Sequence, residues 1–248
     1  MVIINKKRIQ IIISALLVGI FTFSLQIANN NQKGEKNKNQ NNESVIQTTA
    51  TPVSGKTVVL DAGHGVPDEG AQSSNGTTEA ETNLKITLKV QNLLEQSGCN
   101  VILTRSDENA IYDLDAQTLK QKKISDIHNR VKIGNESSAD IFVSIHLNKI
   151  PQQQYYGWQC FYKTNDENSI KLAKLLQENL NKSIQKENKR VAMKLDTVYI
   201  MKHVEIPISI VECGFLSNPE EEKQLLENTY QDKLAWGIYN GIIEYFYE

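Results

Sequence analysis

From Lys56 onward, short apolar runs rich in β-branched residues alternate with longer stretches that have helical periodicity. The predicted strands are residues 57–61, 100–104, 140–146, 158–162 and 207–212. The predicted helices are residues 83–97, 121–136, 168–185 and 231–246. This alternation predicts an α/β fold with a largely parallel sheet, because parallel strands need a crossover connection that is usually a helix.

Composition sets the class of protein. The chain has 248 residues, 40% hydrophobic and 23% charged, which is ordinary for a globular domain with one core. A formal net charge of −2 provides no basic field, and no nucleic-acid-binding motif is present, so we exclude nucleic acid as a partner. Cys99, Cys160 and Cys213 are odd in number and widely spaced, so we expect buried apolar side chains rather than disulfides or a thiolate zinc cluster.

The N-terminus predicts an association with the membrane. Residues 9–28 form an uncharged stretch of 20 residues that follows Lys6, Lys7 and Arg8. This length suffices to cross a bilayer as a helix, with the basic residues on the cytoplasmic side. We expect a signal peptide or, preferably, an uncleaved anchor, because no clear AxA cleavage site follows. The rest of the protein would then be extracytoplasmic, either secreted or membrane-anchored.

Three segments are therefore expected along the chain. Residues 1–28 are the signal peptide or membrane anchor. Residues 29–55 are rich in Asn, Gln and Lys, which predicts a disordered tether. Residues 56–248 form the single folded domain, without an internal repeat.

Three residues with catalytic or metal-binding chemistry stand where predicted strands finish: His64, His146 and Glu212. Ligands of open α/β sheets bind outside the carboxyl ends of the strands, so these residues are expected to share a crevice. Gly63 and Gly65 flank the first histidine and permit a tight turn with close approach of the backbone. A lone histidine in a turn is usually a surface residue, but this one has companions.

Glu79 lies just before the first predicted helix, in a loop expected to return over the same crevice. Two imidazoles and one carboxylate would leave a tetrahedral zinc ion one open position, as in catalytic zinc sites. Glu212 lies within the apolar stretch ISIVECGFL, where burial would raise its pKa toward the range useful to a general base. The alternative is an ordinary glutamate in solvent.

The strings DAGHG, TTEAETN, SIHLN and VECGFLSNPEE, in this order and spacing, resemble the zinc-dependent N-acetylmuramoyl-L-alanine amidases of the type 3 family. The resemblance covers about residues 56–247. It implies a twisted, largely parallel mixed sheet of about six strands with helices on both faces. It also implies one Zn²⁺ ion bound by His64, Glu79 and His146, with Glu212 as the catalytic carboxylate.

Glu79 is preferred to Glu81 because the family places a glutamate four residues before an asparagine, here Asn83. The chain departs from the family pattern near these residues. Ala80 replaces the usual lysine after the glutamate, and Ala62 and Val66 replace the proline and third glycine of the DPGHGG pattern.

The resemblance implies hydrolysis of the amide bond between N-acetylmuramic acid and L-alanine of the stem peptide, with the stem-peptide-bearing glycan strands of peptidoglycan as the partner. The membrane segment, the tether and the strings SIHLNKIP and YYGWQCFY are most similar to the sporulation and germination subfamily, which helps to make muramic δ-lactam in the spore cortex. That subfamily implies the forespore intermembrane space as the location and a regulatory or activating protein partner in the spore envelope.

Three alternatives stay open. A vegetative amidase would separate daughter cells, and a zinc peptidase would cleave stem peptides. A tethered wall-binding protein would have a degenerate site, whereas all four site residues are present here.

Other side chains have two interpretations each. Arg105 and Arg130 either bind stem-peptide carboxylates or, as we favour, are solvated or ion-paired. Tyr155, Tyr156 and Trp158 either stack on a sugar or pack in the core.

The remaining candidates lie near helices or near proposed ligands. His128 and His203 are expected on the surface or in helix packing. Asn83 and Asn148 either orient the site or cap turns. The run PEEEK, residues 219–223, predicts the acidic first turn of a helix.

Overall fold

The computed structural model describes residues 51–247. The predicted membrane segment, residues 9–28, and most of the predicted tether lie outside the described residues. Within residues 51–247, no helix combines the length and apolar character needed to cross a membrane.

One mixed sheet of six strands, in the order β2-β1-β3-β6-β4-β5, forms the centre of the domain. The strands are β1 (Thr57–Ala62), β2 (Asn100–Leu103), β3 (Ile141–Asn148), β4 (Gln159–Tyr162), β5 (Met193–Lys194) and β6 (Ile208–Phe215). All neighbouring strands pair in parallel except β4 and β6, which are antiparallel. The predicted α/β class, with a mixed and largely parallel sheet, is confirmed.

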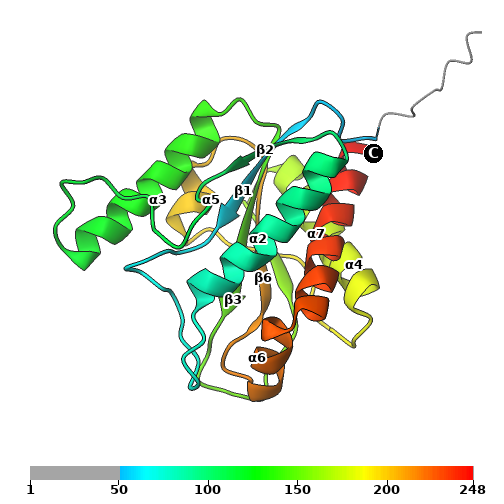
Figure 1. Ribbon diagram of the computed structural model, residues 1–248. Coiled ribbons are helices and arrows are strands. Elements are labelled where there is room, and N and C mark those ends of the chain that lie inside the picture. The colour runs from blue at the N-terminus through cyan, green and yellow to red at the C-terminus, as the bar shows by residue number, and fades with distance from the viewer. Residues whose placement is uncertain (1–50, 248) are drawn as a thin grey trace, which may run out of the picture. The chain divides into compact units, whose positions relative to one another are not determined.

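Helices cover both faces of this sheet (Figure 1). The helices are α2 (Glu79–Gln96), α3 (Leu119–Glu136), α4 (Glu167–Ile184), α5 (Tyr199–His203), α6 (Pro219–Leu226) and α7 (Asn228–Tyr247). Apolar side chains of α2, α4 and α7 form the larger core on one face, and α3 and α5 form the smaller core on the other. Strands β1, β2, β3, β4 and β6 contribute alternate residues to the two cores, so a side chain's face follows from its position in the strand.

The structure corrects several predicted boundaries. α2 begins at Glu79, where Thr78 is the N-cap, so Glu79 is the first helical residue and not part of a loop. β3 and β6 continue past His146 and Glu212, so these residues lie inside strands near their carboxyl ends. β5 and α5 were not predicted, because two and five residues are too few to show a period.

The helix predicted at PEEEK is present as α6. Pro219 is its first residue, and the side chain of the N-cap Asn218 accepts hydrogen bonds from the backbone N–H groups of Glu220 and Glu221. Proline at this position loses no helical hydrogen bond, since the first N–H groups of a helix have no partner within it.

Two glycines let α7 pack closely on α4. A Cβ on Gly241 would lie 2.8 Å from the Cα of Leu176, and a Cβ on Gly237 would lie 2.9 Å from the Cα of Leu180. These are backbone contacts, which cannot be relieved by turning a side chain. The crossing therefore requires both glycines.

We expect Gly241→Ala to lower the free energy of unfolding by about 1–2 kcal/mol. Alanine has a higher helix propensity than glycine by about 1 kcal/mol, but its Cβ would force the two helices apart, and we expect that loss of packing to cost more. Urea denaturation measures the change. Lys233→Ala, on an exposed part of the same helix, should stay within about 0.5 kcal/mol of the wild type. A stabilised Gly241→Ala variant would show that propensity outweighs the contact.

Candidate metal centre and active site

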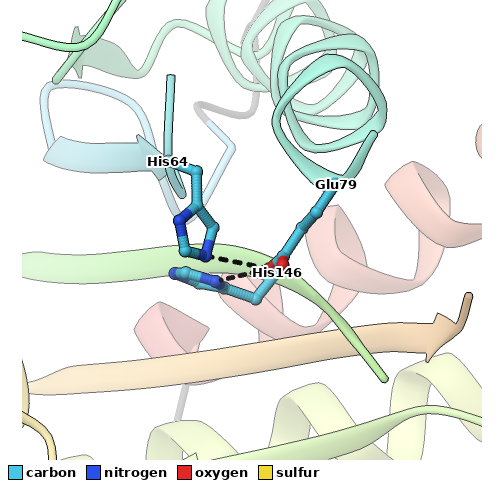
Figure 2. A group of neighbouring side chains, drawn as sticks. All are labelled: His64, Glu79 and His146. Atoms are coloured by element: carbon cyan, nitrogen blue, oxygen red, sulfur yellow. Dashed lines mark hydrogen bonds and ion pairs between the residues drawn. The ribbon is translucent and has the colours of Figure 1, made fainter. Parts of the chain in front are cut away.

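His64, Glu79 and His146 lie together although they come from three separate elements (Figure 2). Glu79 Oε1 is 3.3 Å from His64 Nε2 and 2.9 Å from His146 Nδ1. One ligand atom from each residue lies within 4.8 Å of the other two. Two imidazole nitrogens and one carboxylate oxygen are a donor set that suits Zn²⁺ and leaves a fourth tetrahedral position for water or substrate. The residues present therefore match the metal that the sequence suggested.

The turn after β1 brings His64 over the sheet. His64 itself has a left-handed backbone with a φ of 63°, which is uncommon for a residue with a Cβ. Gly63 leaves room for the imidazole of His146, since a Cβ on residue 63 would lie 2.2 Å from His146 Cε1. Gly65 has a φ of 152°, and a Cβ there would lie 2.6 Å from the backbone nitrogen of Ala110. Glycine is therefore required on both sides of the histidine, as predicted, because a Cβ at each position would collide with a different part of the chain.

Arg130 binds this turn from α3. Its guanidinium donates to the carbonyl oxygens of Ala62 at 2.7 Å and His64 at 2.6 Å. It also pairs with Asp61 at 2.5 Å and Asp126 at 2.8 Å. Only 1% of Arg130 is exposed, so these contacts replace its hydration. The ion-paired interpretation of Arg130 is therefore correct, and the side chain has no donor directed at a stem peptide.

Arg105 binds the same turn from the end of β2. It donates to the carbonyl oxygens of Ala62 at 2.8 Å, Gly63 at 3.2 Å and Ala80 at 2.7 Å. Because Ala80 is in the first turn of α2, this one side chain connects the loop of His64 to the helix of Glu79. The residue is 3% exposed, so the solvated interpretation of Arg105 was wrong.

Further contacts orient the three candidate ligands. Asp68 Oδ2 lies 3.3 Å from His64 Nδ1, which leaves the other ring nitrogen facing Glu79. Glu79 Oε2 accepts from the backbone N–H of Ala71 at 2.8 Å, and its Oε1 accepts from Leu147 at 3.2 Å. Carboxylate and backbone partners of this kind fix the orientation of metal-binding side chains.

Asp68 was missed by the sequence analysis, although it lies only four residues after His64. An aspartate in a turn has many ordinary roles, so spacing alone could not identify it. Asn83 donates from Nδ2 to the carbonyl oxygen of Gly63 at 3.1 Å, which supports its orienting role. Asn148 ends β3, where its carbonyl oxygen accepts from the backbone of Leu216.

Protonation within the cluster follows from its charges. Burial tends to raise the pKa of Glu79, but hydrogen bonds from His146 and His64 outweigh it and lower the pKa well below the usual range. Burial tends to lower the pKa of His64, but Asp68 and Glu79 outweigh it and raise the pKa to about 9. A divalent cation would compete with that proton for the same ring nitrogen, so metal binding at this site should release protons.

Glu212, on β6, lines a cavity together with His64 and His146. It is directly opposite His146 in the parallel pair of β3 and β6. The residue is part-exposed, yet its Oε2 is buried and has no hydrogen-bond partner among the described residues. Burial, followed by the charge of Glu79, raises the pKa of Glu212 to about 7, although both histidines oppose the shift. Such a carboxyl group can both accept and donate a proton near neutrality.

The cavity has a volume of about 290 Å³. His64, His146 and Glu212 line its polar side. Its apolar wall is formed by Ile127, Leu195, Val198, Ile200 and Ile210. Convergent polar groups against an apolar wall are typical of a binding site for a small part of a substrate.

The other candidates lie elsewhere. His128 and His203 are exposed and pack against Tyr199, with ring centroids at 4.7 Å and 3.8 Å. Trp158 is fully buried and belongs to the core, whereas Tyr155 and Tyr156 are 45% and 39% exposed.

All three cysteines are buried, as predicted. Burial raises the pKa of the Cys213 thiol well above its usual value, so its nucleophilic thiolate form is disfavoured.

Known proteins resemble the chain over most of its length. The sequence model of a family described as N-acetylmuramoyl-L-alanine amidase matches residues 58–244. The germination-specific N-acetylmuramoyl-L-alanine amidase of Bacillus subtilis strain 168 is 34% identical over 94% of this chain and 92% of that protein.

Solved structures of amidases are also similar to this chain. The CwlD amidase of Clostridioides difficile, in complex with the GerS lipoprotein, has 45% identity and a TM-score of 0.75, over 77% of this chain and 98% of that one. The catalytic domain of CwlV, an N-acetylmuramoyl-L-alanine amidase from Bacillus (Paenibacillus) polymyxa var. colistinus, has 30% identity and a TM-score of 0.66, over 77% and 97%.

We expect Asp68→Asn to weaken Zn²⁺ binding by about 10–100-fold, because the amide no longer supports the orientation of His64 as a carboxylate does. Competition with a chromophoric chelator measures the affinity. Asp115→Asn, in an exposed part of the chain between β2 and α3, is the matched control and should bind Zn²⁺ like the wild type. Unchanged affinity in Asp68→Asn would show that Asp68 does not support the metal site.

Proposed function

Because the chain belongs to the N-acetylmuramoyl-L-alanine amidase family, whose members hydrolyse peptidoglycan, we propose that it performs this reaction with one Zn²⁺ bound by His64, Glu79 and His146. The bond cleaved is the amide between the lactyl group of N-acetylmuramic acid and L-alanine. One observation carries the proposal: the three ligand atoms lie within 4.8 Å of one another, and two of the three residues, His64 and His146, line a cavity together with Glu212.

A Zn²⁺ ion held by these residues would supply Lewis acidity, which activates water and polarises a carbonyl. The chain supplies the geometry for this chemistry. His64 and His146 present ring nitrogens whose orientation is set by Asp68 and by the backbone of β3. Glu79 presents one oxygen to the site, while its other oxygen accepts from the backbone of Ala71.

Glu212 acts as the proton carrier. It accepts a proton from the attacking water as the new C–O bond forms at the carbonyl carbon. It then delivers that proton to the nitrogen of L-alanine as the C–N bond breaks. The products are a free lactyl carboxylate and a free amino group on the stem peptide. Burial raises the pKa of Glu212, and a general acid–base group works best when its pKa is close to the operating pH.

We infer that the biological substrate is spore-cortex peptidoglycan and that cleavage is the first step toward muramic δ-lactam. The similarity to the germination-specific amidase of Bacillus subtilis and to CwlD of Clostridioides difficile supports this inference. The vegetative cell-separation role and the stem-peptide peptidase are the alternatives.

The location and the partner are part of the same proposal. Residues 9–28 would place the domain outside the cytoplasmic membrane, and the location we propose is the forespore intermembrane space. Since the related CwlD was solved with the GerS lipoprotein, we propose that this chain also has a protein partner in the spore envelope.

The experiment that tests the activity is mass spectrometry of muropeptides incubated with the purified chain, before and after chelation. We expect free lactyl carboxylates and L-alanine-terminated peptides, lost on chelation and restored by Zn²⁺. Products cut within the stem peptide would identify a peptidase instead. Activity that persists after verified metal removal would contradict the metal mechanism.

Glu212→Gln should keep Zn²⁺ but lose about 100-fold or more in rate, because the amide cannot accept the proton. The readout is product formation together with metal analysis of the same sample. Glu220→Gln removes an equal charge at an exposed position and should retain full activity. Near-normal turnover by Glu212→Gln would remove Glu212 from the mechanism.

A further inference from the structure

An arginine that the mechanism does not use, Arg190, is hydrogen-bonded to the strand that pairs with β6 at Glu212. Gln159 is directly opposite Glu212 in the antiparallel pair of β4 and β6, so the two side chains point to the same face of the sheet. Residues opposed in this way have Cα atoms about 4.5–5.5 Å apart. Arg190 Nη1 donates to Gln159 Oε1 at 3.2 Å. One glutamine side chain therefore connects the guanidinium to the neighbourhood of the proposed proton carrier.

Several contacts orient Arg190. Its Nε donates to the carbonyl oxygen of Tyr156 at 3.3 Å. Its guanidinium carbon lies 4.7 Å from the centroid of the Phe215 ring and 6.0 Å from that of Tyr155. The residue is part-exposed, so the oriented group still reaches solvent.

Among the described residues, no carboxylate forms a direct ion pair with Arg190, although its charge acts to lower the pKa of the nearby Glu221. Glu187 is close in sequence but pairs with Lys189 at 3.3 Å. The buried Glu221 accepts hydrogen bonds from the backbone of Gly157 and Phe215 instead. An oriented arginine that makes no direct contact with a carboxylate of its own chain has N–H groups with which to bind an anion from outside.

The surface around Arg190 favours an anion over a sugar ring. Residues 154–156 and 187–190 line a hollow of about 390 Å³ next to β4. The two exposed tyrosines there already have cations near their rings, since Lys186 Nζ lies 4.5 Å from the centroid of Tyr156 and Arg190 lies near Tyr155. Their faces are therefore less available for stacking on a pyranose, and the surface presents positive charge.

We propose that Arg190, oriented by Gln159 and by the carbonyl of Tyr156, is the subsite that binds a carboxylate of the stem peptide while the scissile amide lies at Glu212. This subsite rests on the proposed function. The guanidinium would donate two parallel N–H hydrogen bonds to the two oxygens of the carboxylate. The peptide beyond L-alanine would then extend over β4, away from the apolar wall formed by residues 195–200.

The test compares two synthetic muropeptides that differ only in their stem peptides, one with free carboxylates and one with the same groups as carboxamides. Arg190→Ala should lower kcat/KM for the carboxylate substrate by roughly ten-fold or more, mainly through KM, because a charge-assisted hydrogen bond is lost. For the carboxamide substrate the change should stay under about three-fold. Arg190→Lys keeps the charge without the fork and should fall between the wild type and Arg190→Ala on the carboxylate substrate.

Lys194→Ala, at an exposed position on β5, removes the same charge nearby and should behave like the wild type on both substrates. Equal losses on both substrates in Arg190→Ala would overturn the subsite and assign Arg190 a structural role. No loss on either would also overturn it. A wild-type chain that cleaves neither muropeptide would instead overturn the proposed function, and the subsite with it.

Discussion

A buried ion pair between Asp61 and Arg130 determines where the active-site turn lies. Burial tends to raise the pKa of Asp61, but Arg130 and the Ser144 hydroxyl outweigh it and lower the pKa below the usual range, so the carboxylate stays charged. Removing one partner of a buried pair typically costs about 3–5 kcal/mol of stability, so we expect a single substitution of either Asp61 or Arg130 to be strongly destabilising. Because the same guanidinium binds the carbonyls of Ala62 and His64, stability and ligand placement depend on one side chain.

The sheet then determines which residues can meet. Asp61, Ser144, His146 and Glu212 all point to the face covered by α3 and α5, because neighbouring strands are in register and side chains alternate. Among the residues of the site, Glu79 comes from the other face of the sheet, where it is the first residue of α2. The cluster is thus where the N-terminus of one helix reaches around the carboxyl ends of β1 and β3 (Figure 2).

α6 connects this centre to the surface beside β4. Glu221 accepts from the backbone of Gly157, before β4, and from Phe215, at the end of β6. Glu222 accepts from Asn75 and Thr77, in the loop that leads to α2. Glu221 and Glu222 of the PEEEK run therefore order loops on both sides of the site, although neither lines the cavity of Glu212.

The sequence by itself determined the α/β class, the main strands and helices, and which side chains would gather at one edge of the sheet. The elements could be predicted because the spacing of apolar residues is visible within short segments of the sequence. The site could be predicted because His64, His146 and Glu212 stand near the carboxyl ends of predicted strands. Tertiary structure alone decided that Glu79 starts a helix, that Asp68 supports His64, and that two arginines bind the turn instead of a substrate. Those outcomes depend on contacts between residues far apart in the chain, such as Arg130 with Asp61, and no local pattern records them. β5 and α5 belong to the same group, since elements of two and five residues are too short to have a period.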